Sequence, residues 1–152
     1  MGFKKKRFKK LRSHKRIKNC RKRNKNGLPQ DIKKIVKLIE KKTIKNKKIT
    51  LNLALNYGSK EEIINAFSKL ISKKKREISI NNFEKGLYTH NIPDPEILIR
   101  TGGRKRLSNF LLWQLAYAEI FFIDKLWPDF NENDFNKIVK KFYKIKRNFG
   151  NI

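Results

Sequence analysis

Cationic side chains surround a pair of glycines between residues 99 and 119. The glycines are Gly102 and Gly103, and the cations are Arg100, Arg104, Lys105 and Arg106. A diphosphate needs such a set, because guanidinium groups form paired hydrogen bonds with phosphate oxygens and glycine lets the backbone approach an anion closely. The same residues also fit an ordinary turn with solvated charges, and local chemistry alone leaves both interpretations open.

Two elements must position this turn. Pro93 and Pro95 force an extended approach into an apolar run at residues 96–100, which predicts a short buried strand that ends at the glycines. Ser108 follows the turn and predicts the N-cap of a helix over residues 108–118. The amides at the start of that helix would add donors for a bound anion.

The other elements alternate between strand and helix. Apolar spacing predicts helices over residues 29–42, 59–71, 81–88 and 135–145, and strands over residues 49–57 and 120–123. Ser59 and Glu62 form a capping-box pattern at the start of the second of these helices. This alternation favours an α/β fold with a mainly parallel sheet flanked by helices, in which ligands bind beyond the carboxyl ends of the strands.

The chain is strongly basic. It has 152 residues, enough for one domain, and 40 Lys and Arg against 13 Asp and Glu give a formal charge of +27. Nucleic-acid binding would explain this excess. However, Lys, Asn and Ile are over-used together, which favours a compositional bias that places Lys on solvated faces. No RNA-binding motif appears, so we do not expect a nucleic-acid partner.

Residues 1–27 are predicted to form a basic leader. Residues 1–26 hold 14 Lys and Arg and no acid, so the segment repels itself and is expected to be disordered when unbound. Cys20 is the only cysteine, which excludes an intramolecular disulfide. No apolar run approaches the roughly 20 residues of a membrane span, and the basic start lacks the apolar stretch of a secretory signal. We expect a cytoplasmic protein that meets membranes only at their surface.

Two longer segments carry a family resemblance. They read LNLALNYGSKEEI and PDPEILIRTGGRKRLSNFLLWQLAYAEIFFIDKLWPDF. The first is similar to the central strand-turn-helix motif, and the second to the C-terminal signature, of cis-prenyltransferases of the undecaprenyl diphosphate synthase (isoprenyl transferase) type. Together they cover residues 51–130, with weaker similarity back to residue 28. The resemblance implies that residues 28–152 form the C-terminal half of a cis-prenyltransferase domain.

The resemblance implies roles for five residues. Arg100, Arg106 and Ser108 would bind the diphosphate of isopentenyl diphosphate, and Leu107 would contribute backbone contact between them. Glu119 would ligate Mg²⁺, a hard cation that prefers carboxylate and phosphate oxygens. The implied reaction condenses isopentenyl diphosphate with an allylic diphosphate, and its repetition gives a Z-polyprenyl diphosphate for carrier-lipid synthesis.

The N-terminal part departs from the family pattern. Its members begin with a strand and an Asp-Gly-Asn-x-x-Arg loop that binds the allylic diphosphate and supplies an essential aspartate. Residues 1–50 contain no match, and Asp31 is the only Asp before residue 94, so the sequence identifies no catalytic residue. Arg104 also stands where relatives usually carry an acid, and Ser59-Lys60 replaces their Gly-Arg pair. We therefore expect a partial fold without this strand and loop, and no chain elongation by this polypeptide alone.

The resemblance also implies partners. Isopentenyl diphosphate and an allylic diphosphate are the expected ligands, and a homodimer or a complex with a partner subunit is the expected assembly. The lipid product brings the membrane surface into consideration. The alternative function is a small basic RNA-binding protein that uses residues 1–26, which is disfavoured because the charge run lacks aromatic interleaving beyond Phe3 and Phe8.

Overall fold

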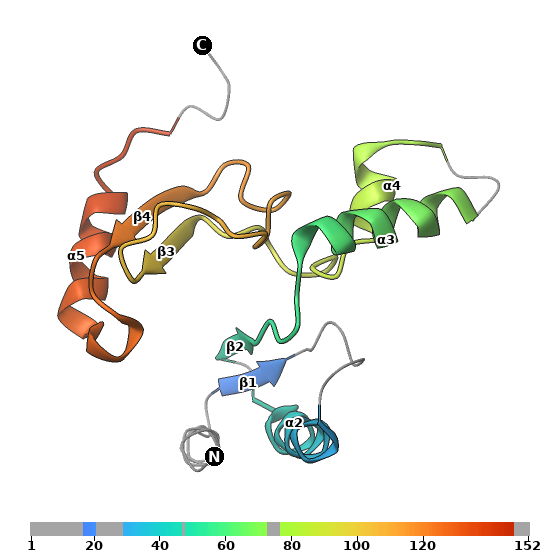
Figure 1. Cartoon of the computed structure of the whole chain (residues 1–152), viewed down its shortest axis with the longest axis horizontal. Coiled ribbons are helices and arrows are strands. Elements are labelled where there is room, and N and C mark those ends of the chain that lie inside the picture. The colour runs from blue at the N-terminus through green and yellow to red at the C-terminus, as the bar shows by residue number, and fades with distance from the viewer. Residues whose placement is uncertain (1–16, 21–28, 47, 73–76, 148–152) are drawn as a thin grey trace. The chain divides into compact units, whose positions relative to one another are not determined.

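The computed structural model describes residues 17–20, 29–46, 48–72 and 77–147, and the chain divides into two compact units, Met1–Tyr57 and Gly58–Ile152. Figure 1 shows the helices and strands of both units. Every strand pair in the described residues is parallel, which confirms the predicted α/β class. No helix within these ranges combines the length and the apolarity that crossing a membrane would need.

The first unit is a parallel strand pair joined through a helix. Strand β1 (Ile17–Cys20) pairs in register with β2 (Ile49–Asn52). Parallel neighbours need a long crossover connection, and α2 (Gln30–Thr43) lies within it. Helix α2 agrees with the helix predicted at residues 29–42 and buries Ile39, whereas β2 is shorter than the strand predicted at residues 49–57.

Strand β1 lies inside residues 1–27, for which the sequence predicts no regular structure. That prediction is wrong for Ile17–Cys20, because ladder pairing with β2 satisfies backbone groups without requiring an apolar pattern in the strand. The rest of the leader lies outside the described residues. So does the predicted domain boundary near residue 28, which stays a prediction.

The second unit contains the parallel pair that ends at the glycine turn. Strand β3 (Ile97–Thr101) runs beside β4 (Glu119–Ile123), with Ile97 opposite Glu119 and Thr101 opposite Ile123. After the 3₁₀ turn η1 (Trp127–Asp129), α5 (Glu132–Phe142) lies beside β4 and buries Ile138 (Figure 1). These strands and this helix agree with the sequence prediction to within a few residues.

Two further helices complete this unit. Helix α3 (Ser59–Ser72) begins at the predicted residue, and α4 (Ile80–Glu84) is shorter than the helix predicted at residues 81–88. The two helices lie side by side (Figure 1). The apolar residues buried in this part of the unit are Ala66, Leu70, Leu87 and Leu115.

The helix predicted over residues 108–118 does not form. Ser108, Asn109 and Leu111 have φ angles of 51°, 61° and 47°, and the segment consists of turns. Left-handed residues cannot continue a right-handed helix, because the path of the backbone reverses at each of them. Apolar spacing gives no warning of such angles, so periodicity alone led to the wrong element.

Candidate functional site

The carboxyl ends of β3 and β4 are tied together at the glycine turn. The amide of Gly102 donates to the carbonyl of Lys125 at 2.8 Å, and the amide of Gly103 donates to the carbonyl of Ile123 at 3.1 Å. Their φ angles are 88° and 68°, which glycine adopts without the strain that a side chain would cause. The sequence prediction of a glycine turn at a strand end is therefore confirmed.

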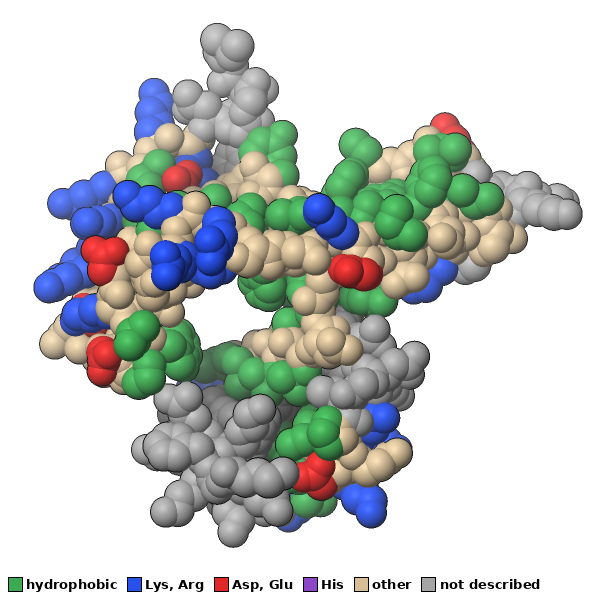
Figure 2. All heavy atoms as spheres, viewed as in Figure 1, with side chains coloured by type: hydrophobic (Ala, Val, Ile, Leu, Met, Phe, Trp, Pro, Cys, Tyr) green, Lys and Arg blue, Asp and Glu red, His purple; other side chains and the backbone are tan. Residues whose placement is uncertain are grey.

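Four cationic side chains surround this turn. Arg100 is half-buried on β3, whereas the other three are exposed: Arg104, Lys105 and Arg106. None of the four pairs with a carboxylate in the described residues, where every ion pair involves Lys125 or Arg147. Figure 2 shows Lys and Arg side chains gathered over β3, β4 and α5, with several carboxylates among them. An anion at the turn would not have to displace an internal counter-ion.

Backbone donors are available beside these cations. Within the part of the chain that the structure describes, the amides of residues 104–108 donate to no carbonyl or side chain. The carbonyl of Leu107 accepts from the amide of Phe110 at 3.2 Å. Ser108 is exposed. The turn thus offers amide, hydroxyl and guanidinium donors together, as a diphosphate requires.

Residues 109–112 are bound to the first turn of α3. The carbonyl of Asn109 accepts from the amide of Ser59 at 2.8 Å, and its side-chain Oδ1 accepts from the amide of Lys60 at 2.8 Å. The amide of Leu112 donates to Ser59 Oγ at 2.9 Å. Asn109 therefore satisfies two of the amides that the start of any helix leaves without intrahelical partners.

Glu62 does not close a capping box with Ser59. Its carboxylate is only 1% exposed and accepts from the amide of Tyr88 at 2.5 Å and from Gln114 Nε2 at 3.2 Å. Gln114 Nε2 also donates to the hydroxyl of Thr89 at 2.8 Å. The sequence pattern located the start of the helix correctly but missed that its polar side chains join three segments of the unit.

Glu119 lies at the other end of the strand pair from the turn. It starts β4 opposite Ile97, whereas Arg100 lies three residues further along β3, a rise of about 10 Å. Because side chains alternate between the faces of a sheet, Glu119 and Arg100 also leave opposite faces. Arg147 Nε is 3.9 Å from Glu119 Oε1, and Arg147 Nη1 donates to Glu96 at 3.3 Å.

The role of Glu119 as a ligand of Mg²⁺ stays a prediction. No group of three His, Cys, Asp or Glu side chains in the described residues could hold a metal ion. The guanidinium of Arg147 pairs with both Glu119 and Glu96. Arg100 lies on β3 before the glycine turn, and Arg106, Leu107 and Ser108 follow the turn in the chain. Glu119, the fifth predicted residue, starts β4 opposite Ile97, and the roles of all five residues stay predictions.

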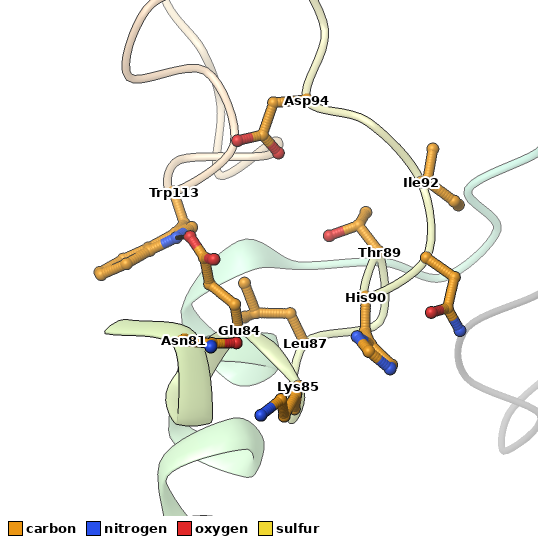
Figure 3. A pocket seen from close by; sticks show the side chains of 10 residues that line it. Asn81, Glu84, Lys85, Leu87, Thr89, His90, Ile92, Asp94 and Trp113 are labelled. Carbon is orange, nitrogen blue, oxygen red and sulfur yellow. Dashed lines mark hydrogen bonds between the residues drawn. The ribbon is translucent and has the colours of Figure 1, made fainter. Parts of the chain in front are cut away.

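A cavity of about 400 Å³ opens beside α4. Figure 3 shows the side chains of Glu84, Asp94 and Thr89 turned toward it, and the indole N–H of Trp113 donates to Glu84 Oε1 at 3.0 Å. Burial, and then the negative charge of Glu84, raises the pKa of the Asp94 carboxyl above its usual value. Because both carboxylates repel anions, this cavity does not suit a diphosphate.

The parallel strand pairs and the helices that connect them make this chain an α/β protein. The model of the family described as "Putative undecaprenyl diphosphate synthase" matches residues 3–150, and the chain belongs to this family. The matched range starts well before residue 28, where the resemblance in the sequence begins.

Curated relatives agree with this family. The chain is 44% identical over 128 residues to an isoprenyl transferase of Fusobacterium nucleatum and 42% identical over 132 residues to one of Thermotoga maritima. Each alignment covers 84% of the chain, but only 55% and 57% of the two relatives. The chain thus spans about half the length of the curated relatives it matches.

Two solved structures resemble the fold across nearly the whole chain. A probable undecaprenyl diphosphate synthase from Campylobacter jejuni has a TM-score of 0.85 at 32% identity, covering 97% of this chain and 71% of that one. Lavandulyl diphosphate synthase from Lavandula x intermedia, solved in complex with dimethylallyl diphosphate, has a TM-score of 0.86 at 33% identity. That alignment covers 97% of this chain and 66% of the other.

Proposed function

We propose that this chain provides the isopentenyl diphosphate site of an isoprenyl transferase. The observation that carries the proposal is the turn after β3, where four cations without carboxylate partners in the described residues surround two glycines in left-handed conformation. The guanidinium groups of Arg100 and Arg106 would bind the diphosphate, with the amide of Leu107 and the hydroxyl of Ser108 between and beside them.

The reaction of the complete enzyme would condense isopentenyl diphosphate with an allylic diphosphate to give a Z-polyprenyl diphosphate. Dimethylallyl diphosphate, which the lavandulyl diphosphate synthase structure contains, is an allylic diphosphate. The turn would hold the acceptor, isopentenyl diphosphate, and fix the position of its reacting end. Positioning of this kind lowers the barrier of a two-substrate reaction by several kcal/mol.

Magnesium at Glu119 stays a prediction, as do a homodimer or partner subunit, contact with the membrane surface and a cytoplasmic location. Mg²⁺ usually binds through one or two carboxylates together with substrate phosphates. Glu119 would supply one carboxylate. Because Glu119 lies at the other end of β3 and β4 from the glycine turn, the phosphate oxygens would have to come from a substrate that is not bound at this turn. A Mg²⁺ titration of wild type and Glu119→Gln, followed by calorimetry with and without inorganic pyrophosphate, tests this role.

Calorimetry and a radiolabel assay test the proposed function. The purified chain should bind isopentenyl diphosphate and inorganic pyrophosphate, but not isopentenol, which lacks the anion. With farnesyl diphosphate, labelled isopentenyl diphosphate and Mg²⁺, we expect no polyprenyl product from this chain alone. No binding of either diphosphate would refute the proposal, and product that disappears in Glu119→Ala would show that the chain elongates by itself.

A further inference from the structure

The backbone beside Ser108 is held in an unfavourable conformation. Three of the four residues at positions 108–111 have positive φ angles, and none of them is glycine. Non-glycine residues in this region cost on the order of 1–3 kcal/mol each and persist only where the surroundings hold them. Asn tolerates the left-handed conformation better than most residues do, whereas Ser and Leu gain no such advantage. Contacts elsewhere must therefore stabilise the segment.

The stabilising contacts converge on Asn109. Its carbonyl and its Oδ1 each accept from an amide of α3, both at 2.8 Å, and its Nδ2 donates to Glu61 Oε2 at 3.3 Å. Neighbouring Leu112 adds the bond from its amide to Ser59 Oγ. Because Asn109 directly follows Ser108 in the chain, these bonds attach the backbone next to Ser108 to the first turn of α3.

We infer that Asn109 is a positioning residue for the diphosphate-binding turn. It fixes the left-handed backbone at residues 108–111 through α3 and thereby orients Ser108 and the amides of residues 104–108 toward one anion. Asn109 itself does not touch the substrate, since all three of its polar side-chain and carbonyl groups are engaged by α3. This inference rests on the proposed function for its ligand, but its structural part can be measured without one.

Hydrogen exchange followed by mass spectrometry measures the structural part. In Asn109→Ala, the peptide over residues 104–115 should exchange about ten-fold faster, because the bonded amides of Phe110, Leu112 and Leu115 lose their support. Asn109→Gly should behave in the same way, since glycine keeps the left-handed backbone but lacks the side chain. Exchange at wild-type rates in both variants would overturn the inference.

A second helix provides the matched control. Asn131 caps α5 with the same chemistry, its Oδ1 accepting from the amide of Asp134 at 3.2 Å. Asn131→Ala should therefore speed exchange in α5 and leave residues 104–115 unchanged. If it speeds exchange in residues 104–115 as much as Asn109→Ala does, the effect is general loosening and Asn109 has no positioning role.

A pair of substitutions that swaps the acid and the amide tests whether the contact between Asn109 and Glu61 can be restored. Asn109→Asp keeps the acceptor for the Lys60 amide but places a second carboxylate beside Glu61. Adding Glu61→Gln places an amide donor beside the new aspartate at position 109. Hydrogen exchange over residues 104–115 should therefore be slow again in the double variant but not in Asn109→Asp alone. Fast exchange in the double variant would show that the two side-chain hydrogen bonds of Asn109 do not hold the segment.

Affinity for isopentenyl diphosphate connects the segment to the ligand. Calorimetry should give about ten-fold weaker binding for Asn109→Ala than for wild type, with recovery in the double variant and no change in Asn131→Ala. Faster exchange with unchanged affinity would overturn the positioning role. If wild type binds no diphosphate at all, the proposed function fails, and the exchange data alone decide whether Asn109 holds the segment.

Discussion

The turn after β3 and the cavity beside α4 are opposite in their electrostatics, although both lie in the second unit. The turn gathers Arg100, Arg104, Lys105 and Arg106, none of which has a carboxylate partner in the described residues. The cavity places Glu84 beside Asp94, and the pKa of Asp94 is raised by burial and by that neighbouring charge. The cavity beside α4 is therefore not the region that suits a diphosphate.

The two regions also differ in how their backbone is built. The turn depends on Gly102, Gly103 and three left-handed non-glycine residues, so its shape requires support from β4 and α3. The cavity is formed by a short helix and the loop that follows it, with no such angles at its lining residues. The strained backbone of the turn, with its cationic side chains, is a stronger indication of an anion site than the cavity is. Such strain persists only where surrounding contacts maintain it.

The largest expected effect is at the turn. Arg100→Ala should weaken binding of isopentenyl diphosphate by at least ten-fold, because a charge-assisted hydrogen bond contributes about 1.5–3 kcal/mol. Calorimetry measures this directly. The matched control is Glu84→Gln, which neutralises a charge in the cavity and should leave the affinity within two-fold of wild type. Equal affinity in wild type and Arg100→Ala would remove Arg100 from the site.

A smaller effect is expected from the glycine pair. Gly103→Ala should lower the free energy of unfolding by about 1–2 kcal/mol, since alanine at a φ of 68° meets its own backbone. The new Cβ would lie 3.5 Å from Asp124 Oδ1, which is an ordinary contact, so the loss should come from the backbone. Gly103→Asn should retain most of the stability, as measured by urea unfolding, because Asn accepts this conformation. Equal losses in both variants would point to crowding instead.

The smallest effect is expected in the cavity and depends on pH. Since the folded-state pKa of Asp94 is raised, the folded protein binds the proton more tightly than the unfolded chain does. This contribution is present below the usual pKa of an aspartate and is lost as pH rises through the raised value. Asp94→Asn should therefore be more stable than wild type at pH 7 and equally stable near pH 3, as followed by thermal unfolding. A stability difference that does not change with pH would show that ionisation of Asp94 does not destabilise the folded protein.

The local features of this protein could be predicted from its residues alone. Apolar periodicity predicted α2, α3, α5, β3 and β4, and the dipeptide Gly102-Gly103 predicted the turn between the cations. These features depend on neighbours in the chain, such as a side-chain period or the freedom of glycine at positive φ. The family resemblance likewise rested on contiguous residues and is confirmed by the match over residues 3–150.

How distant segments meet could be seen only in the folded chain. The tertiary structure replaced the predicted helix at residues 108–118 by turns that Asn109 ties to α3, and it paired Ile17–Cys20 with β2. It also placed Glu119 at the far end of the strands from Arg100. The two residues are 19 positions apart in the sequence, and that spacing does not predict how far apart they lie in the fold. The physical reason is that each of these outcomes depends on hydrogen bonds or strand register between segments far apart in the chain, which no local pattern of residues encodes.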